Sequence, residues 1–127
     1  MLDEGLQIND GGRNQSGYYG ESNDCTVRAY ALAANLSYDT AHDLFQSFGR
    51  GYGKRCSFEG FMQVREPNIK PEQFYKPRPR VKTLLKKHLL KNAVIRVRGH
   101  VFCVKNNIIL DMSDKRNCIV LQVWNFN

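Results

Sequence analysis

Two apolar runs separated by a pair of asparagines occupy the stretch Gly99-His100-Val101-Phe102-Cys103-Val104-Lys105-Asn106-Asn107-Ile108-Ile109-Leu110-Asp111. Asparagine tolerates a positive φ angle, so Asn106-Asn107 predicts a two-residue turn and the flanking runs predict a β-hairpin. Counting outward from the turn, Phe102 pairs with Asp111, and His100 lies on the same face as Phe102. Asp111 is therefore a diagonal neighbour of His100, about 7–8 Å away at Cα and within reach of a hydrogen bond.

Helices are predicted before this hairpin and further strands on either side of it. Asp24 and Ser37 are expected to be N-caps, Gly49 ends the second helix, and apolar residues recur at helical spacing after each cap. The predicted helices cover residues 25–35, 38–48 and 81–91, and the predicted strands cover 93–98, 100–105, 108–111 and 118–126. Helices followed by an antiparallel meander indicate an α+β fold in a single domain, residues 1–127.

Two segments have no clear periodicity. Residues 1–20 contain half of the ten glycines and predict an irregular lead-in. Residues 49–79 contain all four prolines and predict a long loop. Such a loop is uncommon in a compact domain, so it is either functional or hides a short element around residues 58–64.

Charge and cysteine usage limit the possible partners and the compartment. Nineteen Lys and Arg against twelve acidic residues give a net charge of +7, which favours acidic partners and permits nucleic-acid contact. The N-terminus has no apolar stretch typical of a signal peptide, and no apolar run is long enough to cross a membrane. We therefore expect a cytoplasmic protein with reduced thiols. The four cysteines have neither CxxC nor zinc-ligand spacing, so we expect no metal and no cofactor.

Cys25 stands at the predicted start of the first helix. The partial positive charge and free N–H groups of a helix N-terminus favour thiolate over thiol. An imidazolium at His100 would lower the thiol pKa further, and Asp111 would fix the orientation of that imidazole. Asp24 opposes this effect because a neighbouring negative charge raises a thiol pKa, and Arg28 would offset it. These residue types together predict a cysteine nucleophile system.

The residues that carry this chemistry also resemble those of a known family. Asn23-Asp24-Cys25-Thr26-Val27-Arg28-Ala29, then Arg98-Gly99-His100-Val101-Phe102, then Asp111 are similar to the papain-like cysteine peptidase superfamily, most of all its small bacterial and phage members such as bacteriocin-processing peptidases. The resemblance covers residues 23–35 and 93–126. It implies a papain-like fold whose central helix packs on a C-terminal antiparallel sheet. It also implies Cys25 as nucleophile, His100 as general base and acid, and Asp111 as the orienting residue.

The sequence departs from the family pattern near the expected oxyanion hole. Papain-like enzymes usually have a Gln about six residues before the Cys, but Tyr19 stands there. Gln15 and Asn23 are the candidates to replace that donor. Loss of one oxyanion donor typically lowers the rate about 100- to 1000-fold, so weak activity is compatible with this sequence. Tyr18, Tyr19, Arg28 and the 49–79 loop are candidates to line the substrate cleft, although Arg28 fits a buried ion pair better.

Each of these residues also has a purely structural interpretation. Cys25 is compatible with a small buried thiol, His100 with a core histidine bonded to a backbone carbonyl, and Asp111 with a strand-end cap. His42 and His88 fit packing positions on the second and third helices. Cys103 and Cys118 are predicted to be core residues. Cys56 is predicted to lie in a loop, directly after the basic residues Lys54 and Arg55. The sequence alone favours the nucleophile system because the helix start and the hairpin are independent signals.

A basic region supports an alternative function. Residues 73–110 contain ten Lys and Arg and no acid, which creates a positive field that attracts acidic proteins, nucleic acid or anionic lipid. The candidate binding face consists of Arg78, Arg80, Lys82, Lys86 and Lys87. The first hypothesis is a thiol hydrolase that cleaves an amide or isopeptide bond in an acidic protein or peptide substrate. The alternative is a weakly active or inactive binding module on the same fold, and a phage protein acting on a host factor in the host cytoplasm fits both.

Overall fold

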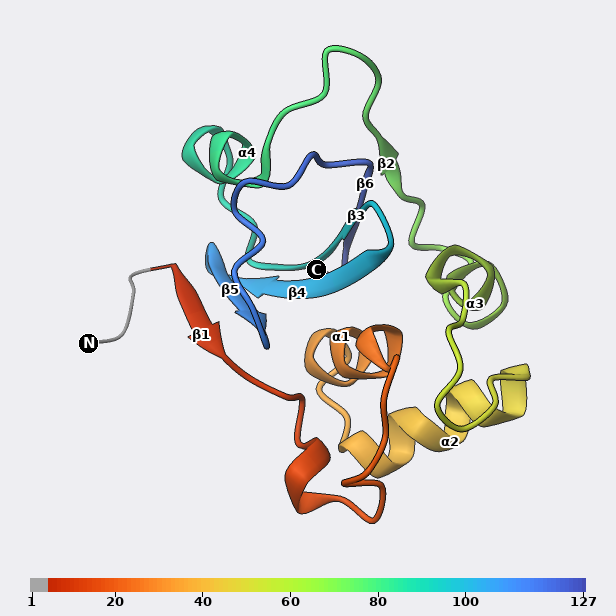
Figure 1. The fold of residues 1–127 in the computed structure, drawn as a ribbon. Helices are drawn as coiled ribbons and strands as arrows, with labels where there is room; N and C mark the ends of the chain where they lie inside the picture. The colour runs from red at the N-terminus through yellow and green to blue at the C-terminus, as the bar shows by residue number, and fades with distance from the viewer. Residues whose placement is uncertain (1–4) are drawn as a thin grey trace.

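The computed structural model describes residues 5–127 and has an α+β architecture (Figure 1). The described chain contains four α-helices and six strands. The helices are α1 (Cys25–Ala33), α2 (Tyr38–Phe48), α3 (Phe58–Arg65) and α4 (Val81–Lys87), and a short 3-10 helix covers Arg13–Gln15. The strands are β1 (Leu6–Ile8), β2 (Glu72–Gln73), β3 (Asn92–Val97), β4 (His100–Lys105), β5 (Ile108–Asp111) and β6 (Gln122–Asn125). None of the helices within residues 5–127 has the length and apolar character that a membrane span requires.

All six strands form one mixed sheet. Its order is β1-β5-β4-β3-β6-β2, and every neighbouring pair is antiparallel except β1 and β5, which are parallel. The prediction of an irregular lead-in and an antiparallel sheet is therefore wrong for residues 6–8. A three-residue strand is too short to carry a periodic signal, and this one is defined only by its parallel pairing with β5. The rest of the predicted lead-in contains no further strand in the described residues.

The sheet separates two layers of helices (Figure 1). The helices α1, α2 and α3 pack on one face, where Val94, Val101 and Trp124 of the sheet join the larger core. On the other face α4 and the segments around it pack against Ile95, Phe102 and other residues of a second core. This alternation follows from the two-residue side-chain period of a strand buried on both faces. The helices α1 and α3 both contact the sheet, α3 through Phe58 against Trp124, and α2 packs on the outer side of α1.

The β4–β5 hairpin has the predicted register. Lys105 pairs with Ile108 across the turn, and Asn106 and Asn107 have φ angles of 50° and 61°. The side chain of Asn107 also ends α4, because it accepts a hydrogen bond from the Leu90 N–H and donates to two carbonyls at the end of that helix, those of Leu85 and His88. These contacts explain why α4 stops at Lys87 and not at the predicted residue 91.

The other differences from the prediction concern the ends of helices and strands and the segment of residues 49–79. The helix α1 ends at Ala33, and Asn35 has a positive φ of 56°, which stops it before the predicted end. Residues 49–79 do contain a hidden element, α3, which Ser57 caps by accepting a hydrogen bond from the Gly60 N–H. The last strand is shorter than predicted, with an isolated bridge between Arg80 and Ile119 before β6. His88, predicted to pack, is exposed at the C-terminal end of α4.

The two turn asparagines provide a test of what fixes this hairpin. Asn107→Ala removes three hydrogen bonds from a partly buried side chain and retains the positive φ, so we expect it to lower the free energy of unfolding by about 2–3 kcal/mol more than Asn106→Ala. Asn106→Ala is the matched control, because the exposed Asn106 side chain makes no hydrogen bond to a described residue. This substitution costs only the free energy of placing alanine at a positive φ angle, about 1 kcal/mol. Urea denaturation of both variants measures the difference. Equal losses would contradict the role given to the Asn107 side chain.

Candidate active site

Cys25 is the first residue of α1, as predicted. The preceding residue, Asp24, occupies the N-cap position but makes no capping bond with its side chain, which corrects its predicted role. Its buried carboxylate instead accepts hydrogen bonds from Arg13, Arg28 and the hydroxyl of Tyr38. The N–H groups in the first turn of α1 therefore donate no hydrogen bond to the Asp24 side chain. The negative charge next to the thiol is compensated by two guanidinium groups.

His100 and Asp111 make the contact that the turn geometry predicts. His100 Nε2 lies 2.7 Å from Asp111 Oδ2, and the Asp111 side chain is only 2% exposed. Because Nε2 is occupied by the carboxylate, Nδ1 is the ring nitrogen left for a second partner. The Cys25 thiol lies in the same cleft as His100, and the two groups shift each other's pKa. The three residues thus form one electrostatically coupled chain from α1 to β5, in which His100 and Asp111 are hydrogen-bonded.

The electrostatics of this chain favour a thiolate–imidazolium pair. Burial raises the pKa of Cys25, but the hydrogen bonds from His100 and Val101 and the charges of His100 and Arg28 outweigh burial and lower it below 9.0. Burial likewise lowers the pKa of His100, whereas the Asp111 carboxylate and the Cys25 thiolate raise it from 6.5 to about 9. Burial opposes ionisation of Asp111, yet His100 and Arg28 keep its pKa below the ordinary value of 3.8. The proton therefore resides preferentially on the imidazole and not on the sulfur.

Arg28 joins the two carboxylates of the site. Its Nε lies 3.2 Å from Asp24 Oδ1 and its Nη1 lies 3.1 Å from Asp111 Oδ1. The side chain is mostly buried and is not among the residues that line the cleft, so the predicted contact of Arg28 with substrate is not supported. Arg28 is instead the buried ion-pair partner that the sequence also suggested. It fixes the start of α1 relative to the end of β5.

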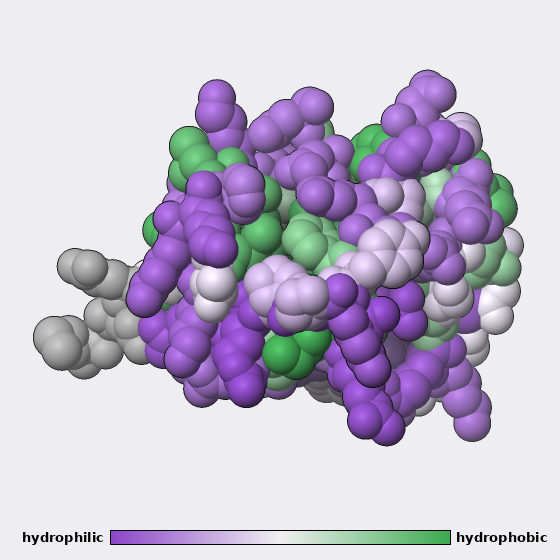
Figure 2. Space-filling view, turned by 90° about the horizontal axis from the view of Figure 1, so that it is seen from above, coloured by the Kyte–Doolittle hydropathy of each residue, from purple (hydrophilic) through white to green (hydrophobic). Residues whose placement is uncertain are grey.

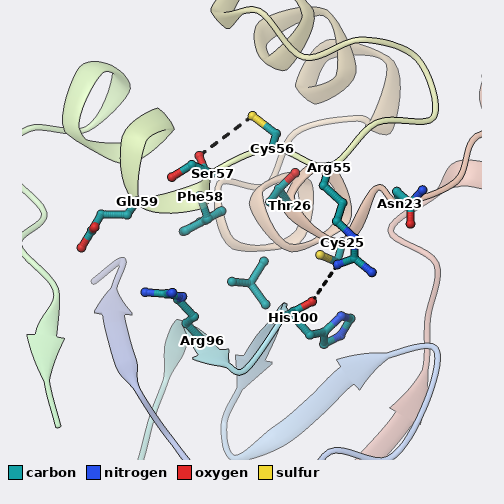
Figure 3. Close-up of a pocket in the computed structure, with 12 residues that line it drawn as sticks. Asn23, Cys25, Thr26, Arg55, Cys56, Ser57, Phe58, Glu59, Arg96 and His100 are labelled. Carbon is teal, nitrogen blue, oxygen red and sulfur yellow. Dashed lines mark hydrogen bonds between the residues drawn. The ribbon is translucent and has the colours of Figure 1, made fainter. Parts of the chain in front are cut away.

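The thiol and imidazole open into a cleft of about 300 Å³ (Figure 3). One wall is the start of α1 with Asn23, Cys25 and Thr26, and the opposite wall is the segment 55–59 before and within α3. The floor is the β3–β4 hairpin, which contributes Arg96 and residues 99–101. In Figure 3 Cys25 and His100 lie at one end of the cleft, and Arg96 and Glu59 lie at the other.

The other predicted site residues lie in different places. Asn23 lines the cleft, but its amide Nδ2 donates to the Gly53 carbonyl. Gln15 is an exposed residue of the 3-10 helix and does not line the cleft. Tyr18 stacks on His42 and donates its hydroxyl to Asp43, and Tyr19 is 73% exposed. Neither tyrosine is among the cleft residues, so the structure does not support their predicted contact with substrate.

Sequence reasoning missed the charged residues on the far wall and floor of the cleft. Arg55 donates to the Gly99 carbonyl at 3.0 Å and thereby crosses the cleft mouth, while Glu59 and Arg96 lie farther in. The long loop was expected to line a cleft, but nothing in its composition indicated which side chains do so. The only local signal was the Ser57 cap, which places the start of α3 beside the site.

A second polar cluster positions the far wall. The buried Glu21 accepts hydrogen bonds from His42 Nε2 at 2.6 Å, Arg50 Nη1 at 2.9 Å and the Gly53 N–H at 2.6 Å. Arg50 in turn donates to the carbonyls of Ser22 and Asn23. Burial opposes ionisation of Glu21, but these donors lower its pKa to about 2. The segment just before Cys25 is therefore tied to the loop that forms the opposite wall.

Comparisons with known proteins add no assignment. No protein-family description matches the sequence, and no curated protein and no solved structure is similar enough to match. Within residues 5–127, no group of three or more His, Cys, Asp or Glu side chains is placed to hold a metal ion. The function therefore has to be argued from the geometry and electrostatics of the cleft.

The raised pKa of His100 predicts a pH dependence of stability. A histidine whose pKa rises on folding from 6.5 to about 9 stabilises the fold fully below pH 6.5, and this stabilisation is lost as the pH rises through 9. Because the lowered pKa of Cys25 acts in the opposite direction, the comparison is made in the Cys25→Ser background, where we expect the difference in free energy of unfolding between chains with and without His100→Gln to be largest near pH 6 and to shrink as the pH rises. Urea denaturation at several pH values measures it. His88→Gln in the same background is the control, since it changes an exposed histidine outside the cleft.

Proposed function

We propose that this protein is a papain-like thiol hydrolase of amide or isopeptide bonds, with Cys25 as nucleophile. The observation that carries the proposal is the Cys25 thiol at the same end of an open cleft as His100, whose imidazole is hydrogen-bonded to Asp111. A half-buried thiol with a lowered pKa beside an imidazole with a raised pKa is the arrangement that cysteine nucleophiles require. A structural cysteine needs none of these partners; Cys103, buried in the core, has a pKa raised by burial to about 12.

The reaction follows from the position of the proton. The Cys25 thiolate attacks the carbonyl carbon of the scissile amide, and the C=O electron pair moves onto oxygen. His100, protonated on its thiol-facing nitrogen, then gives that proton to the leaving amine as the C–N bond breaks and a thioester forms. Water attacks the thioester with His100 accepting its proton, the C–S bond breaks, and the acid product and thiolate are released. Asp111 keeps the imidazole oriented throughout and stabilises its charged form.

The oxyanion formed in these steps needs hydrogen-bond donors. The Cys25 N–H is suited to this role because, as the first N–H of α1, it has no acceptor within the helix. The Asn23 amide, one of the predicted second donors, is engaged with the Gly53 carbonyl, and Gln15 is outside the cleft. We therefore expect a slow hydrolase, whose rate is about 100- to 1000-fold below that of enzymes with a complete oxyanion hole.

Selective alkylation tests the nucleophile. We expect iodoacetamide to modify Cys25 faster than Cys56, Cys103 and Cys118, with an apparent thiol pKa below 9.0, and mass spectrometry of peptides from the full chain identifies the modified residue. His100→Ala removes the largest stabilising partner of the thiolate and should raise the Cys25 pKa, while Asp111→Asn should raise it by a smaller amount. His88→Ala is the control and should leave it unchanged. If Cys25 reacts no faster than an ordinary thiol, the hydrolase proposal fails.

A second candidate function, binding of an acidic partner, is favoured by the opposite face of the sheet. Lys82, Lys86 and Lys87 of α4 are exposed, and none of them forms an ion pair with a described residue. Arg78 and Arg80 differ, because each donates a hydrogen bond to a backbone carbonyl, those of Phe74 and Asn117. Figure 2, which looks onto the α4 side, shows hydrophilic side chains over most of this face. Because the sheet lies between this face and the cleft, binding here and hydrolysis are separable.

Charge reversal on α4 tests this second function. We expect a protein with the double substitution Lys86→Glu and Lys87→Glu to lose binding to an acidic polypeptide such as polyglutamate, since long-range attraction depends on the local charge. Cys25→Ala should bind as the unmodified chain does. Fluorescence anisotropy at two salt concentrations measures the affinity, and binding that does not weaken with salt would contradict the electrostatic explanation.

A further inference from the structure

Three paired residues lie in a row across the sheet beyond His100, and two of them, Val101 and Arg96, line the floor of the cleft. Val101 on β4 pairs with Arg96 on β3, and Arg96 pairs with Gln122 on β6. Directly paired residues of neighbouring strands point to the same face, so these three side chains form a row across the sheet. Val101 belongs to the core on the α1 side, which places the row on the cleft face. A substrate that occupies Cys25 and extends along this row reaches Arg96 next.

Gln122 holds a guanidinium and a carboxylate apart at this end of the cleft. Its side chain is buried, its Oε1 accepts from Arg96 Nη1 at 2.7 Å, and its Nε2 donates to Glu59 Oε2. Arg96 and Glu59 therefore do not pair directly in the described structure, although both line the cleft. A guanidinium has five N–H donors, and the bond to Gln122 uses one of them. The remaining donors of Arg96 are held in a fixed position beside the open space (Figure 3).

The charges around the cleft favour an anion at this position. Arg55 and Arg96 contribute two positive charges against the single carboxylate of Glu59, and the Cys25–His100 ion pair is neutral. The negative charge of Glu59 is also partly satisfied by the Gln122 amide. In addition, α1 and α3 both begin at the cleft, so their dipoles add positive potential. A cationic group of a substrate would be attracted by the carboxylate of Glu59 but repelled by the guanidinium groups of Arg55 and Arg96.

We propose that Arg96 binds a carboxylate of the substrate, so that the cleft selects acidic chains for cleavage close to the acid. This inference deepens the proposed hydrolase function and rests on it. An arginine fixed by one hydrogen bond presents its other N–H groups to a carboxylate in a bidentate geometry that lysine cannot reproduce. The carboxylate belongs either to an Asp or Glu side chain or to a chain terminus. Between it and the thiol the substrate crosses the apolar surface of Val101 and Phe58.

Covalent peptide probes test the inference on the full chain. Tripeptidyl vinyl sulfones are suitable because the Cys25 sulfur adds to the β-carbon, the α-carbon takes up a proton, and the adduct stays on the protein. One set carries Glu, Gln or Lys at the first, second or third residue from the warhead. A second set carries a carboxylate or a carboxamide on the sulfone side, which represents a chain terminus after the scissile bond. Mass spectrometry gives the second-order rate constant for labelling of Cys25 by each probe.

We expect one position at which the acidic probe reacts about 10- to 100-fold faster than its amide, the range of a charge-assisted hydrogen bond in a cleft. Arg96→Gln should remove this preference, and Arg96→Lys should retain only part of it. Glu59→Gln should increase the preference, because it removes the competing negative charge. Arg98→Gln is the matched control: it loses the same charge from the same end of the hairpin but from an exposed residue outside the cleft, and the preference should remain.

Iodoacetamide separates failure of this inference from failure of the proposed function. If Cys25 reacts rapidly with iodoacetamide but acidic and amide probes react equally at every position, the carboxylate site is wrong and the hydrolase proposal stands. The same conclusion follows if Arg96→Gln keeps the acid preference. If Cys25 reacts slowly with iodoacetamide, the hydrolase proposal fails first. Unchanged circular dichroism spectra and unchanged midpoints of urea denaturation in Arg96→Gln and Glu59→Gln establish that the variants are folded.

Discussion

The Asp111 carboxylate connects the sheet to the helix that begins at Cys25. One of its oxygens accepts from His100 and the other from Arg28, and Arg28 continues to Asp24 just before the helix. A buried carboxylate without partners would be strongly destabilising, so the fold is compatible with Asp111 at this position only if both cations are in place. The same interactions of Asp111 that stabilise the fold therefore also position the His100 imidazole relative to the Cys25 thiol.

Charge balance explains why so many ionisable groups can be buried here. Arg13, Arg28 and His100 supply positive charge to Asp24, Asp111 and the Cys25 thiolate, and each carboxylate has at least two donors. The Glu21 cluster follows the same rule on the other side of the segment 21–24, with Arg50 and His42 as its partners. The two networks fix both walls of the cleft to this short segment. A substitution in either one should therefore disturb the cleft as well as the stability of the fold.

Some of this arrangement could be predicted from the sequence, and the reason is its local character. The Asn106-Asn107 turn fixes the pairing register, and a register with a period of two fixes the face on which Asp111 lies. The start of α1 was readable from residues within one helical turn. The cleft residues Arg55, Glu59 and Arg96 could not be predicted from the sequence. They come together only because α3 packs on the sheet, and no local sequence pattern indicates that packing. The strand β1 was missed because a three-residue parallel pair is specified by its partner.

In the proposed hydrolase, the residues beyond the thiol matter more than they do in an enzyme with a complete oxyanion hole. The donors that stabilise the Cys25 thiolate also lower its intrinsic reactivity, because nucleophilicity falls as the pKa falls. With a backbone N–H as the main oxyanion donor, little further rate enhancement comes from the reacting atoms themselves. The remaining source is orientation, in which contacts remote from the scissile bond hold the carbonyl against the sulfur. A fixed guanidinium along the cleft floor provides such a contact, so selectivity for acidic chains and the rate of the chemical step would depend on the same residue, Arg96.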